Sequence, residues 1–165
     1  MIPLIVLDIN GMLCIKLEKR TPGSVRCPSY DVKLRPYVTE FLHHMYTYYK
    51  VAFFSSTTEK NAMPICNALL TEEQRNNTLF FWFRDKTRTD PESNDHSTIK
   101  LVHDIREIYD YAKILIIDDS ATKLRFNHAS EVLVCDTYER NDDDTHLLDL
   151  ITMIDAQIEL LATHC

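Results

Sequence analysis

The sequence predicts an α/β fold in which a doubly wound, mostly parallel sheet carries helices on both faces. Short runs of apolar, often β-branched residues recur along the chain, and segments with helical periodicity separate them. Polar side chains directly follow three of these runs. Because the carboxyl ends of parallel strands meet at one edge of a sheet, we expect these side chains to lie close together.

The length of 165 residues is enough for one hydrophobic core. We therefore expect a single domain over residues 1–165, with a variable loop or insertion at 84–98, where the sequence is polar and without hydrophobic periodicity. The chain is too short for a large additional cap over the sheet, so little capping structure is expected.

The first expected strand, residues 4–7, delivers Asp8 to its carboxyl end, and Gly11 then turns the chain. Residues 16–29 are rich in Lys, Arg, Pro and Gly and predict a loop or a short hairpin. A helix is expected to open at Leu34-Arg35-Pro36, since proline suits the first helical turn, and apolar residues then recur with helical spacing.

The remaining elements follow from the same two periodicities. Residues 51–54 predict a second strand, which ends in Ser55-Ser56 and leads into a helix over 59–70. The further expected elements are strands at 79–83, 114–117 and 132–135, a helix over 104–111 and a closing amphipathic helix over 143–161.

Composition excludes several classes of function. The net charge of −7 argues against non-specific binding to nucleic acid, and two glycines are too few for a glycine-rich phosphate loop. Five cysteines without CxxC spacing favour a reducing compartment, so we expect the cytoplasm or the nucleus. The apolar run before Asp8 is too short for a signal peptide or a membrane span, so no membrane association is expected. The seven histidines lack zinc-type spacing, and the oligomeric state is left open.

The polar residues at the strand ends have a chemistry in common. Asp8, Ser55 and the pair Asp118-Asp119 end three expected strands, and Lys100 precedes the helix that leads to the pair. A carboxylate can attack phosphorus, a hydroxyl and a lysine can hold phosphoryl oxygens, and further carboxylates can bind Mg²⁺. The set therefore indicates phosphoryl transfer.

These residues, in this order, resemble the haloacid dehalogenase (HAD) superfamily of phosphotransferases. Within it, the chain resembles the branch of the RNA polymerase II carboxy-terminal-domain phosphatases and the nuclear-LIM-interactor-interacting-factor-like proteins. The supporting segments span nearly the whole chain: Asp8-x-Asn10-Gly11, Val32-Lys33-Leu34-Arg35-Pro36, Phe54-Ser55-Ser56, Lys60-x-Ala62-x-Pro64, Lys100, Asp118-Asp119-Ser120 and the helix that begins near Asp143.

The resemblance implies a HAD-like fold and a Mg²⁺-dependent phosphatase that acts on a phosphorylated protein or a small phosphomonoester. Asp8 would be the nucleophile that forms an aspartyl-phosphate. Asp119, Asp8 and the backbone carbonyl of Asn10 would hold the metal, and Asp118 would be a further ligand or would lie just behind the ligands.

The resemblance also implies how the phosphate is bound. Ser55, with Ser56 beside it, would hydrogen-bond the phosphoryl group, and Lys100 would neutralise it. Arg84 falls where related phosphatases have an arginine near the substrate; the competing interpretation is an exposed, solvated side chain.

One position departs from the family pattern. The family carries a second aspartate two residues after the nucleophile, which protonates the leaving group and later activates water, and this chain has Asn10 there. Such acid–base help contributes about 10²–10⁴-fold to the rate, and an amide cannot supply it. Three explanations are open: a slow or leaving-group-restricted phosphatase, a pseudophosphatase that binds phosphate or phosphopeptides, or a substitution introduced to trap the enzyme. Met12 likewise stands where the family has a threonine.

Overall fold

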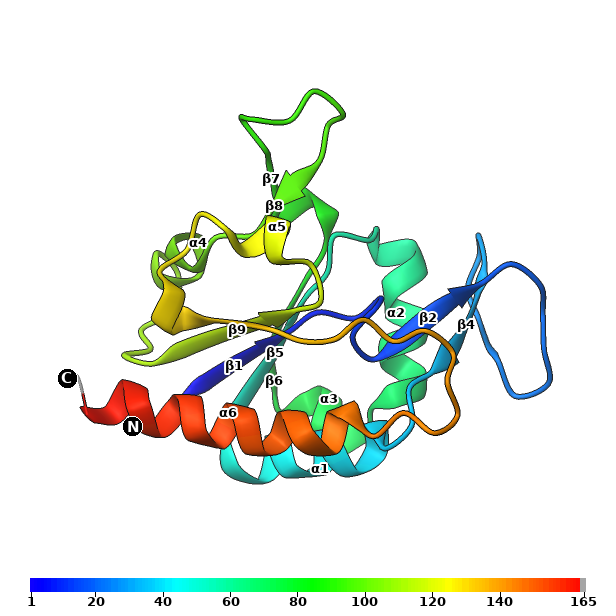
Figure 1. The fold of residues 1–165 in the computed structure, drawn as a ribbon, viewed down its shortest axis with the longest axis horizontal. Helices are drawn as coiled ribbons and strands as arrows, with labels where there is room; N and C mark the ends of the chain where they lie inside the picture. Colours follow the sequence, from blue (N-terminus) through cyan, green and yellow to red (C-terminus); the bar gives the residue numbers. More distant parts are fainter. Residues whose placement is uncertain (164–165) are drawn as a thin grey trace.

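The computed structural model describes residues 1–163, so His164 and Cys165 lie outside the described part of the chain. A five-stranded parallel sheet forms its centre, in the order β10-β9-β1-β5-β6 (Figure 1). The five strands are β1 (Leu4–Leu7), β5 (Lys50–Phe54), β6 (Thr78–Trp82), β9 (Ile114–Asp118) and β10 (Val132–Val134). The prediction of a doubly wound α/β fold is thereby confirmed.

The chain changes direction at the centre of this sheet. It adds β5 and β6 on one side of β1, and it then crosses back to add β9 and β10 on the other side. The carboxyl ends of β1 and β9 therefore lie side by side where the strand order reverses, which is where open α/β sheets bind their ligands.

Alternating side chains of the strands pack into two cores, one on each face of the sheet. Ile5 and Leu7 face a core that they share with α1 (Val38–Tyr48), α2 (Glu59–Leu69) and α6 (His146–Thr163). Leu4 and Val6 face the other core, with α4 (Val102–Arg106) and α5 (Ala121–Leu124). Because both faces are covered, β1 is apolar and buried along its whole length, and β5 and β9 are apolar except for Lys50 and Asp118 at their ends, as expected of parallel strands with helices on both sides.

Two small antiparallel additions follow the carboxyl ends of central strands. After β1 the chain forms a three-stranded sheet in the order β2-β4-β3, and after β6 it forms the pair β7-β8 (Figure 1). Their bounds, with those of the remaining short elements, are β2 (Cys14–Leu17), β3 (Val25–Arg26), β4 (Asp31–Leu34), β7 (Arg88–Thr89), β8 (Thr98–Ile99), α3 (Glu72–Asn76) and the 3₁₀ turns Arg84–Lys86 and Ala129–Glu131.

The segment 84–98, expected as a variable loop, is therefore a short hairpin. Asp90 is buried at its base and forms an ion pair of 2.6 Å with Arg125, just after α5. That ion pair connects the hairpin to the segment that follows β9.

Several predicted boundaries differ from the structure. The helix expected over 104–111 is α4 at Val102–Arg106, because only Val102 and Ile105 carry its buried face. The helix expected to open at Leu34-Arg35-Pro36 begins at Val38, after Tyr37 adopts a left-handed conformation with φ 65°. The closing helix begins at His146 rather than at 143, because the Asp144 carboxylate accepts a hydrogen bond from the His146 backbone and pairs with Arg35. The segment 16–29 contributes to a three-stranded sheet rather than only to a loop or one hairpin.

No helix within residues 1–163 combines the length and the apolar character that crossing a membrane requires. The four cysteines of this range, Cys14, Cys27, Cys66 and Cys135, are unbridged thiols.

Candidate active site

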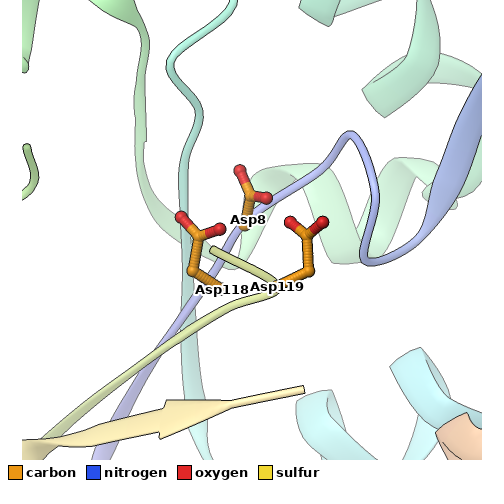
Figure 2. Close-up of side chains that lie close together, drawn as sticks. All are labelled: Asp8, Asp118 and Asp119. Carbon is orange, nitrogen blue, oxygen red and sulfur yellow. The ribbon is translucent and has the colours of Figure 1, made fainter. Parts of the chain in front are cut away.

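Three carboxylates meet at the point where the strand order reverses. Asp8 follows β1, Asp118 ends β9, and Asp119 follows it. Carboxylate oxygens of the three residues lie within 4.8 Å of one another, and their carboxyl groups point to the same side (Figure 2). In the described part of the chain this is the one group of His, Cys, Asp or Glu side chains arranged closely enough to hold a metal ion.

A buried lysine joins two of these carboxylates. Lys100 follows β8, and its side chain is about 1% exposed. Its Nζ donates to Asp8 Oδ1 at 2.9 Å, to Asp118 Oδ2 at 2.6 Å and to the backbone carbonyl of Phe54 at 2.7 Å. The three donors of the ammonium group are thus all used, which fixes its position between the strand ends.

Burial and charge act against each other in this group. The pKa of Asp8 lies well above its usual value because burial disfavours the carboxylate and Asp118 lies close by, and Lys100 offsets this only in part. Burial opposes the charged form of Asp118 as well, but the charge and hydrogen bond of Lys100 bring its pKa below the usual value. Burial would lower the pKa of Lys100, yet the two carboxylates raise it, so the ammonium stays charged. Lys100 therefore stabilises the charged forms of both carboxylates.

Asp119 is held from two sides. Its Oδ2 accepts a hydrogen bond of 2.9 Å from Thr137 Oγ1. On the other side it lies against Gly11, where φ is +87° and an added Cβ would come 2.2 Å from Asp119 Oδ2. Only glycine meets both conditions, because other residues avoid this φ and would displace the carboxylate.

The amide of Asn10 is engaged by hydrogen bonds. Its Nδ2 donates to Thr57 Oγ1 at 2.8 Å and to the Tyr30 hydroxyl at 3.1 Å, and its Oδ1 accepts from Cys14 Sγ at 3.3 Å. Asn10 therefore connects the segment after β1 with the segment after β5 and with the small β2-β4-β3 sheet.

The predicted phosphate-binding residues lie beside the carboxylates. Ser55 follows β5 and is buried, and its Oγ accepts a hydrogen bond from the Thr57 backbone. Ser56 is half-buried, and its carbonyl accepts from Arg84 Nε at 2.9 Å. Arg84 is exposed, and its hydrogen bond to the Ser56 carbonyl places it next to Ser56 at the outer edge of the site.

Reasoning from the sequence missed two residues that the fold brings here. Lys123, in α5, donates from Nζ to Ser56 Oγ at 2.6 Å. Thr137, which holds Asp119, lies in an irregular segment after β10. Neither residue has a local pattern that would distinguish it, because each reaches the site only through long-range packing.

A buried arginine fixes the segment that carries Thr137. The Arg35 guanidinium makes two hydrogen bonds with Asp144, of 2.9 and 3.0 Å, and donates to the carbonyls of Met12 and Asp136. The Tyr138 backbone also donates to the Gly11 carbonyl at 2.8 Å. The turn after Asp8 and the segment after β10 are thus fastened together around Asp119.

The comparisons with known proteins agree with this geometry. The family model of the NLI interacting factor-like phosphatases matches residues 3–163, nearly the whole chain. The chain belongs to this family. The resemblance stated from the sequence is confirmed, and the chain is a phosphatase-type domain of HAD-like fold.

One relative of this NLI interacting factor-like chain is an uncharacterised FCP1 homology domain-containing protein of Schizosaccharomyces pombe, 26% identical over 151 residues. That alignment covers 81% of this chain and 60% of the relative, so the chain spans less than two thirds of it.

Two solved structures share the fold with a TM-score of 0.61 each. One is Fcp1, described as an essential RNA polymerase II CTD phosphatase, at 16% identity over 98% of this chain and 49% of that chain. The other is fission yeast Fcp1 carrying the R271A substitution and bound to beryllium fluoride, at 15% identity over 99% of this chain and 54% of that one. At this identity the likeness establishes the fold.

Proposed function

We propose that the chain is a Mg²⁺-dependent phosphatase that hydrolyses a phosphomonoester, on a phosphorylated protein or a small molecule, through an aspartyl-phosphate on Asp8. The observation that carries the proposal is the Lys100 ammonium between Asp8 and Asp118, beside Asp119 and at the carboxyl edge of the sheet. Membership of a phosphatase family supports it.

The donor set fits a magnesium ion. Three carboxylates supply hard oxygen ligands, and one buried ammonium group is too little positive charge to balance them. Both oxygens of Asp118 are already engaged, one by Lys100 and the other by the Ser120 backbone at 2.9 Å. Asp8, Asp119 and the Asn10 carbonyl would hold the ion, with Asp118 as a further ligand or just behind them. The ion when bound would offset the repulsion between an anionic nucleophile and an anionic substrate.

The chain's own residues account for the first chemical step. A carboxylate oxygen of Asp8 forms a bond to phosphorus while the bond from phosphorus to the ester oxygen breaks. Lys100 stabilises the charge that spreads over the phosphoryl oxygens, and Ser55 and Ser56 donate hydrogen bonds to them. In the second step water attacks phosphorus and gives up a proton to the solvent, while the bond from phosphorus to the Asp8 oxygen breaks, which releases phosphate and restores the Asp8 carboxylate.

Asn10 determines which substrates react quickly. Its amide takes no part in proton transfer, so a leaving alkoxide must take its proton from water. An aryl oxide leaves readily without that proton, whereas a serine alkoxide does not. We therefore expect faster release of phosphate from aryl phosphates than from alkyl phosphates.

The direct test is phosphate release from para-nitrophenyl phosphate and from a phosphoserine peptide, with and without Mg²⁺. Asp8→Asn should abolish turnover, because an amide is not a nucleophile toward phosphorus. Asp110→Asn is a matched control, since Asp110 is exposed and lies in the turn after α4. Wild-type turnover in Asp8→Asn would show that the nucleophile is assigned wrongly.

The second candidate function is a phosphate- or phosphopeptide-binding module with impaired catalysis. The engaged amide of Asn10, at the position of the family's acid–base aspartate, favours it. Asn10→Asp separates the two candidates, because the hydroxyls of Thr57 and Tyr30 can rotate to donate to a carboxylate. A working site lacking one group should gain about 10²–10⁴-fold in hydrolysis. No gain, with phosphopeptide binding retained, would favour the binding module.

The proposed substrate class is a phosphorylated protein segment or a small phosphomonoester, and the proposed location is the cytoplasm or the nucleus. The free thiols of the described cysteines support a reducing compartment. Phosphate release from denatured phosphoprotein compared with small phosphomonoesters distinguishes the two substrate types.

A further inference from the structure

A cleft of about 670 Å³ adjoins the carboxylate cluster. None of the side chains that line it, within residues 1–163, is acidic. They are the basic residues Arg84, His96 and Lys123 and the hydroxyl residues Ser56, Ser97, Thr98, Ser120 and Thr122.

The cleft lies next to the candidate active site, because several residues that line it directly follow residues of that site in the chain. Ser56 follows Ser55 in the chain, and Ser120 follows Asp119. The Lys100 backbone donates a hydrogen bond of 2.9 Å to the carbonyl of Lys123. A substrate whose phosphate lies at Asp8 would therefore place its neighbouring groups in this cleft.

The basic side chains of the cleft form no ion pair with a carboxylate of the described residues. Lys123 is half-buried and donates only to the Ser56 hydroxyl. Its pKa is lowered by burial and then by the nearby charge of Lys100, although the charges of Asp118, Asp8 and Asp119 act in the opposite direction. The terminal guanidinium nitrogens of Arg84 and the imidazole of His96 have no hydrogen-bond or ion-pair partner among the described residues. The Asp95 carboxylate, next to His96, accepts hydrogen bonds from the Ser93 hydroxyl and the Ser97 backbone instead. A half-buried ammonium that forms no direct ion pair loses part of its hydration, and an anionic ligand in contact with it would offset that loss.

We propose that this cleft binds a second anionic group of the substrate, so that the preferred substrate is a peptide with a phosphate or a carboxylate close to the scissile phosphate. The inference rests on the proposed function, since it takes Asp8 as the place where the scissile phosphate binds. Lys123 and Arg84 supply charged donors for such a group, and the surrounding hydroxyls supply neutral ones.

The experiment compares phosphoserine peptides in sets of three that differ at one residue, which is glutamine, glutamate or a second phosphoserine. The varied residue is placed one, two and three positions from the scissile phosphoserine. The readouts are kcat/KM from phosphate release and Kd from fluorescence anisotropy. One charge-assisted contact should favour the doubly anionic peptides by about tenfold, and added salt should reduce that preference. Comparison of the glutamate peptides with the doubly phosphorylated peptides shows whether the cleft binds carboxylates or only phosphate.

Lys123→Met and His96→Asn are the test variants. Methionine keeps the length of the lysine stem, and asparagine tolerates the left-handed conformation of residue 96, whose φ is 61°. Both should reduce the ratio between the doubly and singly anionic peptides toward one. Lys19→Met, at an exposed lysine outside this cleft, should keep the wild-type ratio. Thermal melting checks that each variant is folded.

The outcomes separate this inference from the proposed function. Turnover or binding without a preference for doubly anionic peptides would overturn the second subsite alone, as would a preference that Lys123→Met leaves intact. A binding preference that Lys123→Met abolishes, in a protein with no turnover, would support the subsite and overturn the phosphatase assignment.

Discussion

Gly11→Ala tests the assignment of Asp119 with a matched control in the same chain. The chain has two glycines and both have positive φ, +87° at Gly11 and +81° at Gly23. A Cβ at Gly11 would lie 2.2 Å from Asp119 Oδ2, whereas a Cβ at Gly23 meets no atom within 4 Å. Both substitutions therefore strain the backbone, but only in Gly11→Ala does the new Cβ collide with the Asp119 carboxylate.

The expected magnitudes follow from that difference. Placing alanine in the left-handed region costs about 1–2 kcal/mol, and both variants should lose stability of this order. Only Gly11→Ala must also move the Asp119 carboxylate, by about 1 Å if a normal carbon–oxygen contact is to be restored. A misplacement of that size costs about 10²-fold in rate.

The assays are denaturant unfolding, the rise in melting temperature on addition of Mg²⁺, and phosphate release from an aryl phosphate. We expect Gly23→Ala to keep the Mg²⁺ response and the turnover of the wild type. We expect Gly11→Ala to lose most of both. Equal Mg²⁺ responses and equal turnover in the two variants would refute the assignment of Asp119 as a metal ligand.

Three further predictions concern the residues that support the site. Thr137→Val removes the hydrogen bond to Asp119 with little change of shape, so Mg²⁺ affinity measured by calorimetry should fall by about tenfold. Asp144→Ala leaves the buried Arg35 guanidinium without its carboxylate, so denaturant unfolding should show a loss of about 3 kcal/mol. Lys100→Met removes the charge that lowers the pKa of both carboxylates it contacts. The pKa of Asp118 in the folded state then rises above its value in the unfolded chain, and the pKa of Asp8, already raised, rises further. The stability of Lys100→Met relative to the wild type should therefore fall as pH increases from about 5 to about 8, and a parallel pH profile would contradict this.

The central strands and their polar ends could be predicted from the sequence because the signal is local. The apolar runs that end at Asp8, Ser55 and Asp118 are short, uninterrupted and bounded by polar residues, as strands buried on both faces must be. In a parallel sheet such ends share one edge. That Asp8, Ser55 and Asp118 lie close together could therefore be predicted from the parallel arrangement of the strands, without any knowledge of side-chain contacts.

The helix ends were predicted less well, because tertiary contacts decide them. The sequence pattern predicts that Asp144 belongs to an amphipathic helix. Instead, Arg35 holds the Asp144 carboxylate in front of the first helical turn, and the two residues are 109 positions apart in the chain. The helix before β9 is short because its buried face ends at Ile105. Neither contact is encoded in the periodicity of the segment itself.

The sequence by itself determined which segments form the central strands, which carboxylates follow them, and that residue 10 is an amide, which cannot transfer a proton. These are properties of single segments and of residue chemistry. Only the tertiary structure decided that Lys100 lies between Asp8 and Asp118, that Thr137 and Gly11 enclose Asp119, and that Lys123 joins Arg84 and His96 in one cleft. Each of these depends on atoms that are brought together across tens of residues, and their separation of a few ångströms is fixed by the packing of the two cores on the sheet.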